Sequence, residues 1–121
     1  MNLAKLALVA AGAGVAGWVI ENTVAPPRNA RLVPGLPFLP VYAAGGVAIA
    51  LLAPHLQNQG PAARAVIYGS TLTGLEYATC KLDRATGGKT WDYGGGCIDL
   101  PHAALWAVMG LLAESAIATM E

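Results

Sequence analysis

The sequence predicts an all-α integral membrane protein, a four-helix bundle with a long polar loop between its third and fourth helices. Hydrophobic residues make up 55% of the 121-residue chain and charged residues only 12%, whereas soluble domains carry about 25% charged residues. The mean hydropathy is +0.52, which is typical of a chain that lies in lipid. We therefore expect one transmembrane domain over residues 1–121, with helices at about 3–21, 38–54, 63–80 and 101–120.

The first expected helix, 3–21, carries no charge between Lys5 and Glu21 and is close to the ~20 residues needed to cross a ~30 Å hydrocarbon core. A basic residue before a short apolar run is also typical of a signal peptide. Because the chain begins at Met1, we expect the segment to be retained as a membrane helix. Small residues from Ala10 to Gly17 would let another helix approach closely.

The second expected helix, 38–54, lies in a stretch without any Lys, Arg, Asp or Glu between Arg31 and Arg64. The preceding segment, 22–37, contains Pro26, Pro27, Pro34 and Pro37 and cannot be one continuous helix. Pro40 is tolerated in a first helical turn, where a missing N–H costs little.

The third and fourth expected helices, 63–80 and 101–120, flank the polar loop at 81–100. The third is apolar apart from Arg64 at its start and Glu76 near its end, and Pro101 begins the fourth. Glu114 lies well inside the fourth helix. An oligomer interface or the lipid headgroups would each explain Glu114, and no role is assigned to it.

The distribution of positive charge predicts an orientation. The segments 22–37 and 81–100 lie on one face of the expected bundle and carry five Lys and Arg residues, against two on the opposite face. The positive-inside rule then places both segments in the cytoplasm and both termini outside. A Cys80–Cys97 disulfide would require an oxidising compartment instead, so we expect reduced cysteines.

Polar residues from all four helices fall at the face of these two segments. A carboxylate inside a membrane is costly and normally faces the bundle interior or a polar partner, so the cluster predicts a ligand site. Lipid headgroups solvating ordinary interfacial residues are the alternative. Trp91 and Tyr93 are candidate interfacial anchors, and Asp92 is expected between Arg31 and Lys81 or Arg84. The candidate ligand-binding residues are Glu21, Arg31, Tyr42, Glu76, Trp91, Asp92 and Tyr93.

No cofactor or metal is expected. The run Gly88-Lys89-Thr90 looks like the end of a phosphate-binding loop, but Asp83 stands where that motif needs glycine. The grouping of Cys97, Asp99 and His102 is too loose for a metal site. A net charge of +0 gives no basic face for nucleic acid.

Several motifs follow one another along the chain in a characteristic order and spacing. They are Gly17-Trp18-Val19-Ile20-Glu21, Arg31 followed by Pro37-Phe38-Leu39-Pro40-Val41-Tyr42, Leu75-Glu76-Tyr77, Trp91-Asp92-Tyr93 and Gly96-Cys97-Ile98-Asp99-Leu100. Over about three-quarters of the chain, these motifs resemble the family of small multi-pass bacterial membrane proteins described as putative ABC-transporter type IV, or CmpB-like. The resemblance implies transport and a place in the bacterial inner membrane, and it points to the same seven candidate residues.

Three functions fit these observations. The favoured one is a transporter or permease-like protein that binds a small solute, ion or lipid headgroup, with Glu76 and Glu21 as cation or proton sites and Arg31 as their counter-charge. Four short helices enclose little volume, so a transporter would be a homo-oligomer surrounded by membrane lipids. The alternatives are an interfacial enzyme acting on a lipid, with Glu76 or Asp92 as general base, and an accessory subunit of a larger membrane complex.

Overall fold

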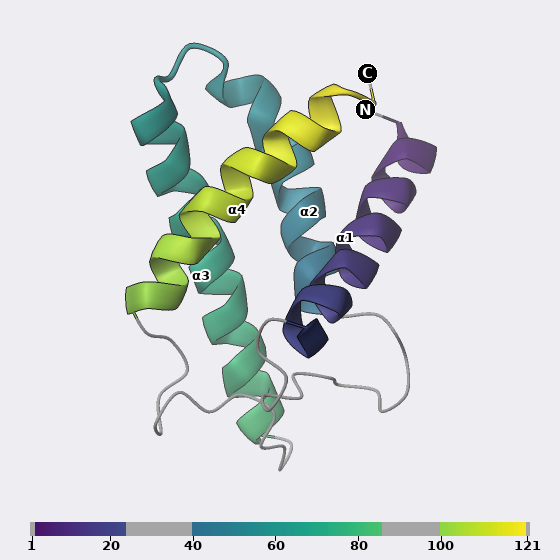
Figure 1. Cartoon of the computed structure of the whole chain (residues 1–121), viewed down its shortest axis with the longest axis vertical. Helices are drawn as coiled ribbons and strands as arrows, with labels where there is room; N and C mark the ends of the chain where they lie inside the picture. The colour runs from purple at the N-terminus through teal and green to yellow at the C-terminus, as the bar shows by residue number, and fades with distance from the viewer. Residues whose placement is uncertain (1, 24–39, 86–99, 121) are drawn as a thin grey trace.

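The computed structural model describes residues 2–23, 40–85 and 100–120 (Figure 1). These ranges contain four α-helices and one 3₁₀ helix, and no strand. The predicted all-α class is therefore confirmed for the described part of the chain. The loop at 86–99 and the Pro-rich segment at 24–39 lie outside it.

The first two helices form near the predicted positions. Helix α1 spans Leu3–Thr23, and Asn2 caps it, because its Oδ1 accepts a hydrogen bond of 2.9 Å from the Lys5 N–H. Helix α2 spans Pro40–Leu52 and continues into the 3₁₀ helix η2, Ala53–Leu56. Pro54 explains the change, since proline has no N–H to donate and clashes with the carbonyl four residues earlier.

Helix α3 is longer than predicted, because it spans Pro61–Ala85 rather than 63–80. The polar residues after Cys80 were assigned to the loop, but residues 81–85 contain neither glycine nor proline, so the backbone has no reason to leave the helix there. Helix α4 spans Leu100–Ala118, close to the predicted 101–120. The prolines at 61 and 101 each stand in a first turn, where proline is favoured.

The described helices pack as two pairs, because α1 packs mainly on α2 and α3 packs mainly on α4. Glycines bring each pair close. A Cβ on Gly46 of α2 would lie 2.7 Å from the Ala13 Cβ of α1, and one on Gly69 of α3 would lie 2.9 Å from the Ala107 Cβ of α4. Ala13 of α1 and Gly46 of α2 therefore allow a close helix contact, as expected for the small residues of the first helix.

Two of these helices are long and apolar enough to cross a membrane, judged by length and composition among the described residues. They are α1, over Leu3–Ile20, and α4, over Leu100–Ala118. The apolar segment Val41–Leu56 is shorter, and α3 is not among the helices that meet this criterion. The structure thus supports association with a membrane.

The ends of the helices fall at two levels (Figure 1). The start of α1, the end of α4 and the 3₁₀ helix η2 lie at one end of the molecule. The end of α1, the starts of α2 and α4 and the end of α3 lie toward the other. We call these the η2 end and the α3 end.

Candidate functional site

The candidate site lies on a row of buried side chains along α3, which we call the inward stripe. Its members recur every fourth residue, so they lie one above another on one face of the helix. All four are nearly inaccessible to solvent, with exposed fractions of 0% for Tyr68, 5% for Leu72, 4% for Glu76 and 0% for Cys80. Glu76 is thus a buried carboxylate between Leu72 and Cys80 on this stripe.

The neighbours of the stripe show that Glu76 faces α2. One turn before it, Leu72 fills the space beside Gly45, since a Cβ there would lie 2.7 Å from the Leu72 Cδ2. One turn after it, Cys80 forms a buried cluster with Val41. Because both flanking residues of the stripe contact α2, Glu76 lies at the level of residues 41–45 of that helix.

Tyr42, a predicted site residue, lies at this level and joins the two helix pairs. Its ring packs against the cluster of Val41 and Cys80 and occupies the space beside Gly17 of α1. The centroid of the Tyr42 ring is also 5.0 Å from the centroid of the Trp106 ring in α4, and the two ring planes are inclined by 51°. Tyr42 therefore contacts elements from both pairs.

Glu76 is deeper than the sequence suggested. It was placed about one turn before the end of its helix, but α3 continues to Ala85, nine residues further on, or about 13 Å along the helix axis. The next residue, Tyr77, is 46% exposed, and the Lys81 Nζ lies 5.4 Å from its ring centroid. The two neighbouring residues thus point in different directions, with the carboxylate inward.

The rest of the predicted cluster lies where the structure gives no side-chain geometry. Glu21 belongs to α1, but its side chain is outside the described set, as are all atoms of Arg31, Trp91, Asp92 and Tyr93. The contact expected between Asp92 and Arg31 accordingly stays a prediction. Of the seven candidates, the structure places the side chains of two, Tyr42 and Glu76, and it places them at the same level of α2.

The expectation of reduced cysteines is wrong for Cys80, which is disulfide-bonded. The chain's other cysteine, Cys97, lies outside the described residues. That expectation gave more weight to the charge distribution than to the two cysteines. The charge distribution indicates the orientation in the membrane, but not whether two sulfur atoms can meet. The buried Cys80 sulfur at the end of the inward stripe thus forms a covalent cross-link.

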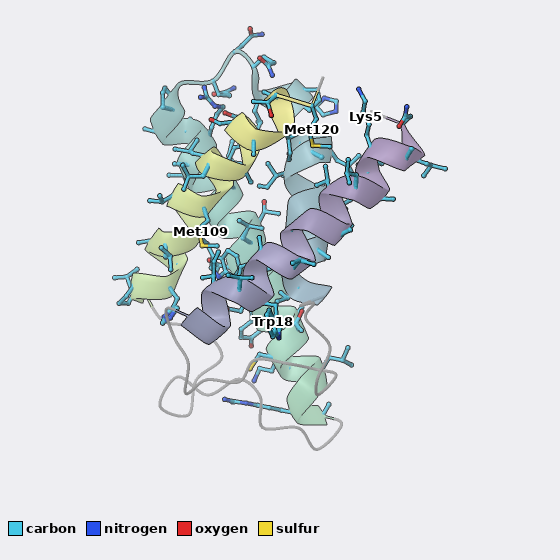
Figure 2. The ribbon with its side chains drawn as sticks, turned by 45° about the vertical axis from the view of Figure 1, so that its right-hand side comes forward. Lys5, Trp18, Met109 and Met120 are labelled. Atoms are coloured by element: carbon cyan, nitrogen blue, oxygen red, sulfur yellow. The ribbon has the colours of Figure 1, made fainter. Side chains whose placement is uncertain are left out.

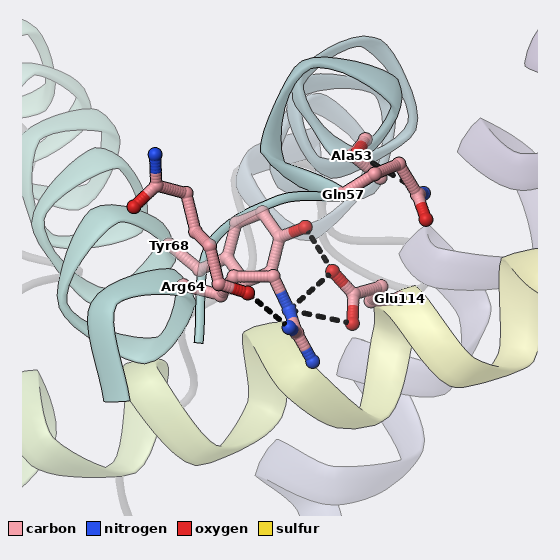
Figure 3. Close-up of polar contacts among 6 residues, drawn as sticks. Ala53, Gln57, Arg64, Tyr68 and Glu114 are labelled. Carbon is pink, nitrogen blue, oxygen red and sulfur yellow. Dashed lines mark hydrogen bonds and ion pairs between the residues drawn. The ribbon is translucent and has the colours of Figure 1, made fainter. Parts of the chain in front are cut away.

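A second polar cluster, which the sequence analysis did not foresee, joins α3 to α4 near the η2 end (Figure 3). We call it the Arg64 cluster. The Arg64 Nε lies 3.2 Å from each carboxylate oxygen of Glu114, and the Tyr68 hydroxyl donates a hydrogen bond to the same carboxylate. The Arg64 Nη1 also donates to the Gln59 carbonyl at 2.7 Å. Glu114 therefore has its partners within the chain.

The Arg64 cluster is suited to holding α3 and α4 together. The side chains of Arg64 and Glu114 are 23% and 18% exposed, so the pair is largely shielded from solvent, and each charge depends on the other. One signal in the sequence could have pointed to it. Arg64 and Tyr68 are four residues apart on one helix face, and in an antiparallel pair the start of α3 must meet the end of α4, where Glu114 is the one carboxylate within the helix.

The described residues contain no group of three or more His, Cys, Asp or Glu side chains that could hold a metal ion. Cys97 and Asp99, from the grouping considered in the sequence, lie outside the described ranges.

Comparison with known proteins gives one match. A family model described as putative ABC-transporter type IV matches residues 11–120. No curated protein and no solved structure matches the chain.

Proposed function

The chain belongs to the putative ABC-transporter type IV family, and from this premise we propose that it is an integral membrane protein that moves a small cation or proton by way of Glu76. The observation that carries the proposal is the position of this carboxylate, which is 4% exposed on the inward stripe of α3. Ionisable residues inside membrane helices are expensive and characteristically mark ion or substrate pathways.

The proposal requires four membrane spans, and the helix lengths support this. The 13 residues of α2 and the four of η2 give a rod of about 27 Å, from rises of about 1.5 and 2.0 Å per residue. Helix α3, with 25 residues, is about 37 Å long. Its segment between Arg64 and Lys81 contains a single charged residue, Glu76. Both helices thus come close to or exceed the ~30 Å hydrocarbon core.

The chemistry of the site favours a cation. A carboxylate is an acceptor and a negative charge, and oxygen ligands suit protons and hard cations. Tyr42, at the same level of α2, can add a hydroxyl. Glu21, Arg31, Trp91, Asp92 and Tyr93 complete the proposed site from the face of the 22–37 and 81–100 segments, with Arg31 as a counter-charge. Because four helices enclose little volume, we propose a homo-oligomer.

The proposal includes an orientation of the chain in the membrane, for which two observations point in opposite directions. The Lys and Arg count favours a cytoplasmic α3 end. The disulfide at Cys80 favours an oxidising compartment for that end. We give the disulfide precedence, since it is covalent and specific to this end of the molecule, and we propose that the α3 end faces outward from a bacterial inner membrane.

The test is an ion-flux measurement on the full chain in proteoliposomes. A potassium diffusion potential drives proton entry, which an entrapped pH-sensitive dye reports, and separate runs measure Na⁺ and K⁺. The wild-type protein is expected to conduct one of these ions above the leak of empty liposomes, and Glu76→Gln to lower the rate at least about tenfold, because the amide carries no charge. Tyr77→Phe, at the exposed neighbouring position, is the matched control and should conduct like the wild type.

Either of two results would contradict the proposal. One is a wild-type rate equal to that of empty liposomes for all three ions. The other is a Glu76→Gln rate equal to that of the wild type. An accessory subunit without transport of its own would give the first result.

A further inference from the structure

An apolar groove is lined by residues of α1, α2 and α4, together with Leu72 of α3. Its volume is about 540 Å³, within the range of about 300–1,000 Å³ typical of ligand sites. Its floor is made of small residues of α1 and α2, and its far wall consists of larger apolar side chains of α4. Members of the floor are Gly12, Ala13, Ala16, Gly45 and Gly46, and members of the wall are Trp106, Met109, Leu112, Ile117 and Met120.

We propose that this groove binds one acyl chain of an anionic phospholipid, whose phosphate pairs with Lys5. This lipid site shares Tyr42 with the proposed cation site, but lipid binding there does not depend on transport.

The dimensions of the groove support an acyl chain. On α1 the lining extends from Leu8 to Ile20, which is about 18 Å along the helix. One leaflet of a ~30 Å hydrocarbon core is about 15 Å thick. The helices on either side, α1 and α4, are those long and apolar enough to span a membrane, so in a bilayer the groove opens at the depth of the lipid tails.

The charge at the end of the groove supports an anionic headgroup. Lys5 precedes Val9, Gly12 and Ala16 at helical spacing on α1, so it continues the groove-facing side of the helix by one turn. Figure 2 shows Lys5 at the same end of the molecule as Met120, where the groove ends on α4. The Lys5 ammonium makes no ion pair with another described residue, and a lysine at this level can reach the phosphates of the membrane surface.

The interior of the groove supplies no competing polar ligand site. Among its lining residues only the Tyr42 hydroxyl and the Trp106 ring N–H are polar side-chain groups. Tails of a bilayer lipid thus match the groove along its length, while a phosphate at its end matches the charge of Lys5.

Gly12 offers a way to fill the groove without disturbing the bundle. It lines the groove, and a Cβ built on it would meet no atom within 4 Å. Gly74 on α3 is a matched control, since it also has open space around its Cβ position and does not line the groove. Replacing either glycine by leucine adds the same volume and the same gain in helix propensity.

The experiment is native mass spectrometry of the full chain in detergent micelles, with phosphatidylglycerol or phosphatidylcholine added. The wild type is expected to retain one phosphatidylglycerol per chain. Gly12→Leu should lower its affinity at least about tenfold, as expected of an overfilled apolar site, whereas Gly74→Leu should bind like the wild type. Lys5→Gln should lower the preference for phosphatidylglycerol over phosphatidylcholine about fivefold, the effect of one basic residue at an anionic surface.

Several outcomes would overturn the proposal. They are a wild type that retains no lipid, equal lipid binding by the two leucine variants, or a Gly12→Leu variant that loses an oligomer without losing lipid. The last would make the groove a docking surface for a second copy. Ala16→Leu, a second groove-filling variant, must agree with Gly12→Leu, and circular dichroism must show that both retain the wild-type helix content.

Discussion

At the scale of single residues, the two helix pairs meet through Tyr42, and Gly17 makes room for it. The tyrosine ring occupies the space where a Cβ of residue 17 would lie, and on its other side the ring meets Trp106. A methyl group at position 17 would have to displace the base of the ring, which is anchored to the α2 backbone and cannot swing aside as the tip of a long side chain could.

Gly17→Ala is therefore expected to destabilise the protein by about 1–3 kcal/mol, the usual cost of overpacking. Gly12→Ala on the same helix meets no atom and should be neutral or gain up to about 1 kcal/mol from helix propensity. Chemical unfolding in detergent, followed by circular dichroism, measures both. Shifts of the same sign and size in the two variants would contradict the packing described for Tyr42.

Residue-level features also mark where sequence reasoning was sufficient and where it was not. Glu76 could be singled out as inward-facing, because an isolated carboxylate in an apolar stretch has few other places to go. The partner of Glu114 could not be predicted directly, since Arg64 is 50 residues away in the chain and their contact depends on how α3 and α4 pair.

At the scale of elements, α3 is held at both ends by different chemistry, the Arg64 cluster at the η2 end and the disulfide of Cys80 at the α3 end. Apolar stretches with few charged residues, three of them starting close to a proline, were enough to predict four helices. These stretches did not predict the last turn of α3. Hydropathy reports which residues suit lipid, whereas a helix can continue through polar residues until its backbone hydrogen bonding is interrupted. Residues 81–85 are polar and still helical.

The Arg64 cluster predicts a measurable coupling energy. Arg64→Ala and Glu114→Ala should each lower the free energy of unfolding by about 2–3 kcal/mol. This value lies between those for exposed ion pairs and for fully buried ones, in line with the partial exposure of the two side chains. The double variant should lower the free energy of unfolding by clearly less than the sum of the two single effects. Unfolding free energies of the three variants form the cycle, and strict additivity would show that the pair does not link the helices.

The disulfide predicts resistance to alkylation. In denaturant without reductant, the protein purified from its membrane should incorporate no iodoacetamide, and after reduction it should incorporate two equivalents, one for each cysteine in the chain. Mass spectrometry of the intact chain distinguishes the two states. Incorporation of two equivalents before reduction would contradict the bond at Cys80 and would restore the cytoplasmic orientation of the α3 end.

At the scale of the whole molecule, the proposed ion pathway requires four membrane spans that carry Glu76 into the membrane. Two helices meet the criteria for a span by themselves, while α2 with η2 and α3 are proposed as spans from their lengths and from their packing between the other two. If α3 crosses the membrane, its two ends lie on opposite sides. Glu76 can serve as a transmembrane ion site only if the two ends of α3 lie on opposite sides.

The most direct test labels the two ends of α3 in intact cells. Asn58→Cys and Ala85→Cys, both at exposed positions, are made separately in a chain whose native cysteines are replaced by serine, and a membrane-impermeant maleimide is applied before and after lysis. We predict that Ala85→Cys is labelled in intact cells and Asn58→Cys only after lysis. Labelling of both positions from the same side would contradict a membrane-spanning α3, and with it the proposed role of Glu76.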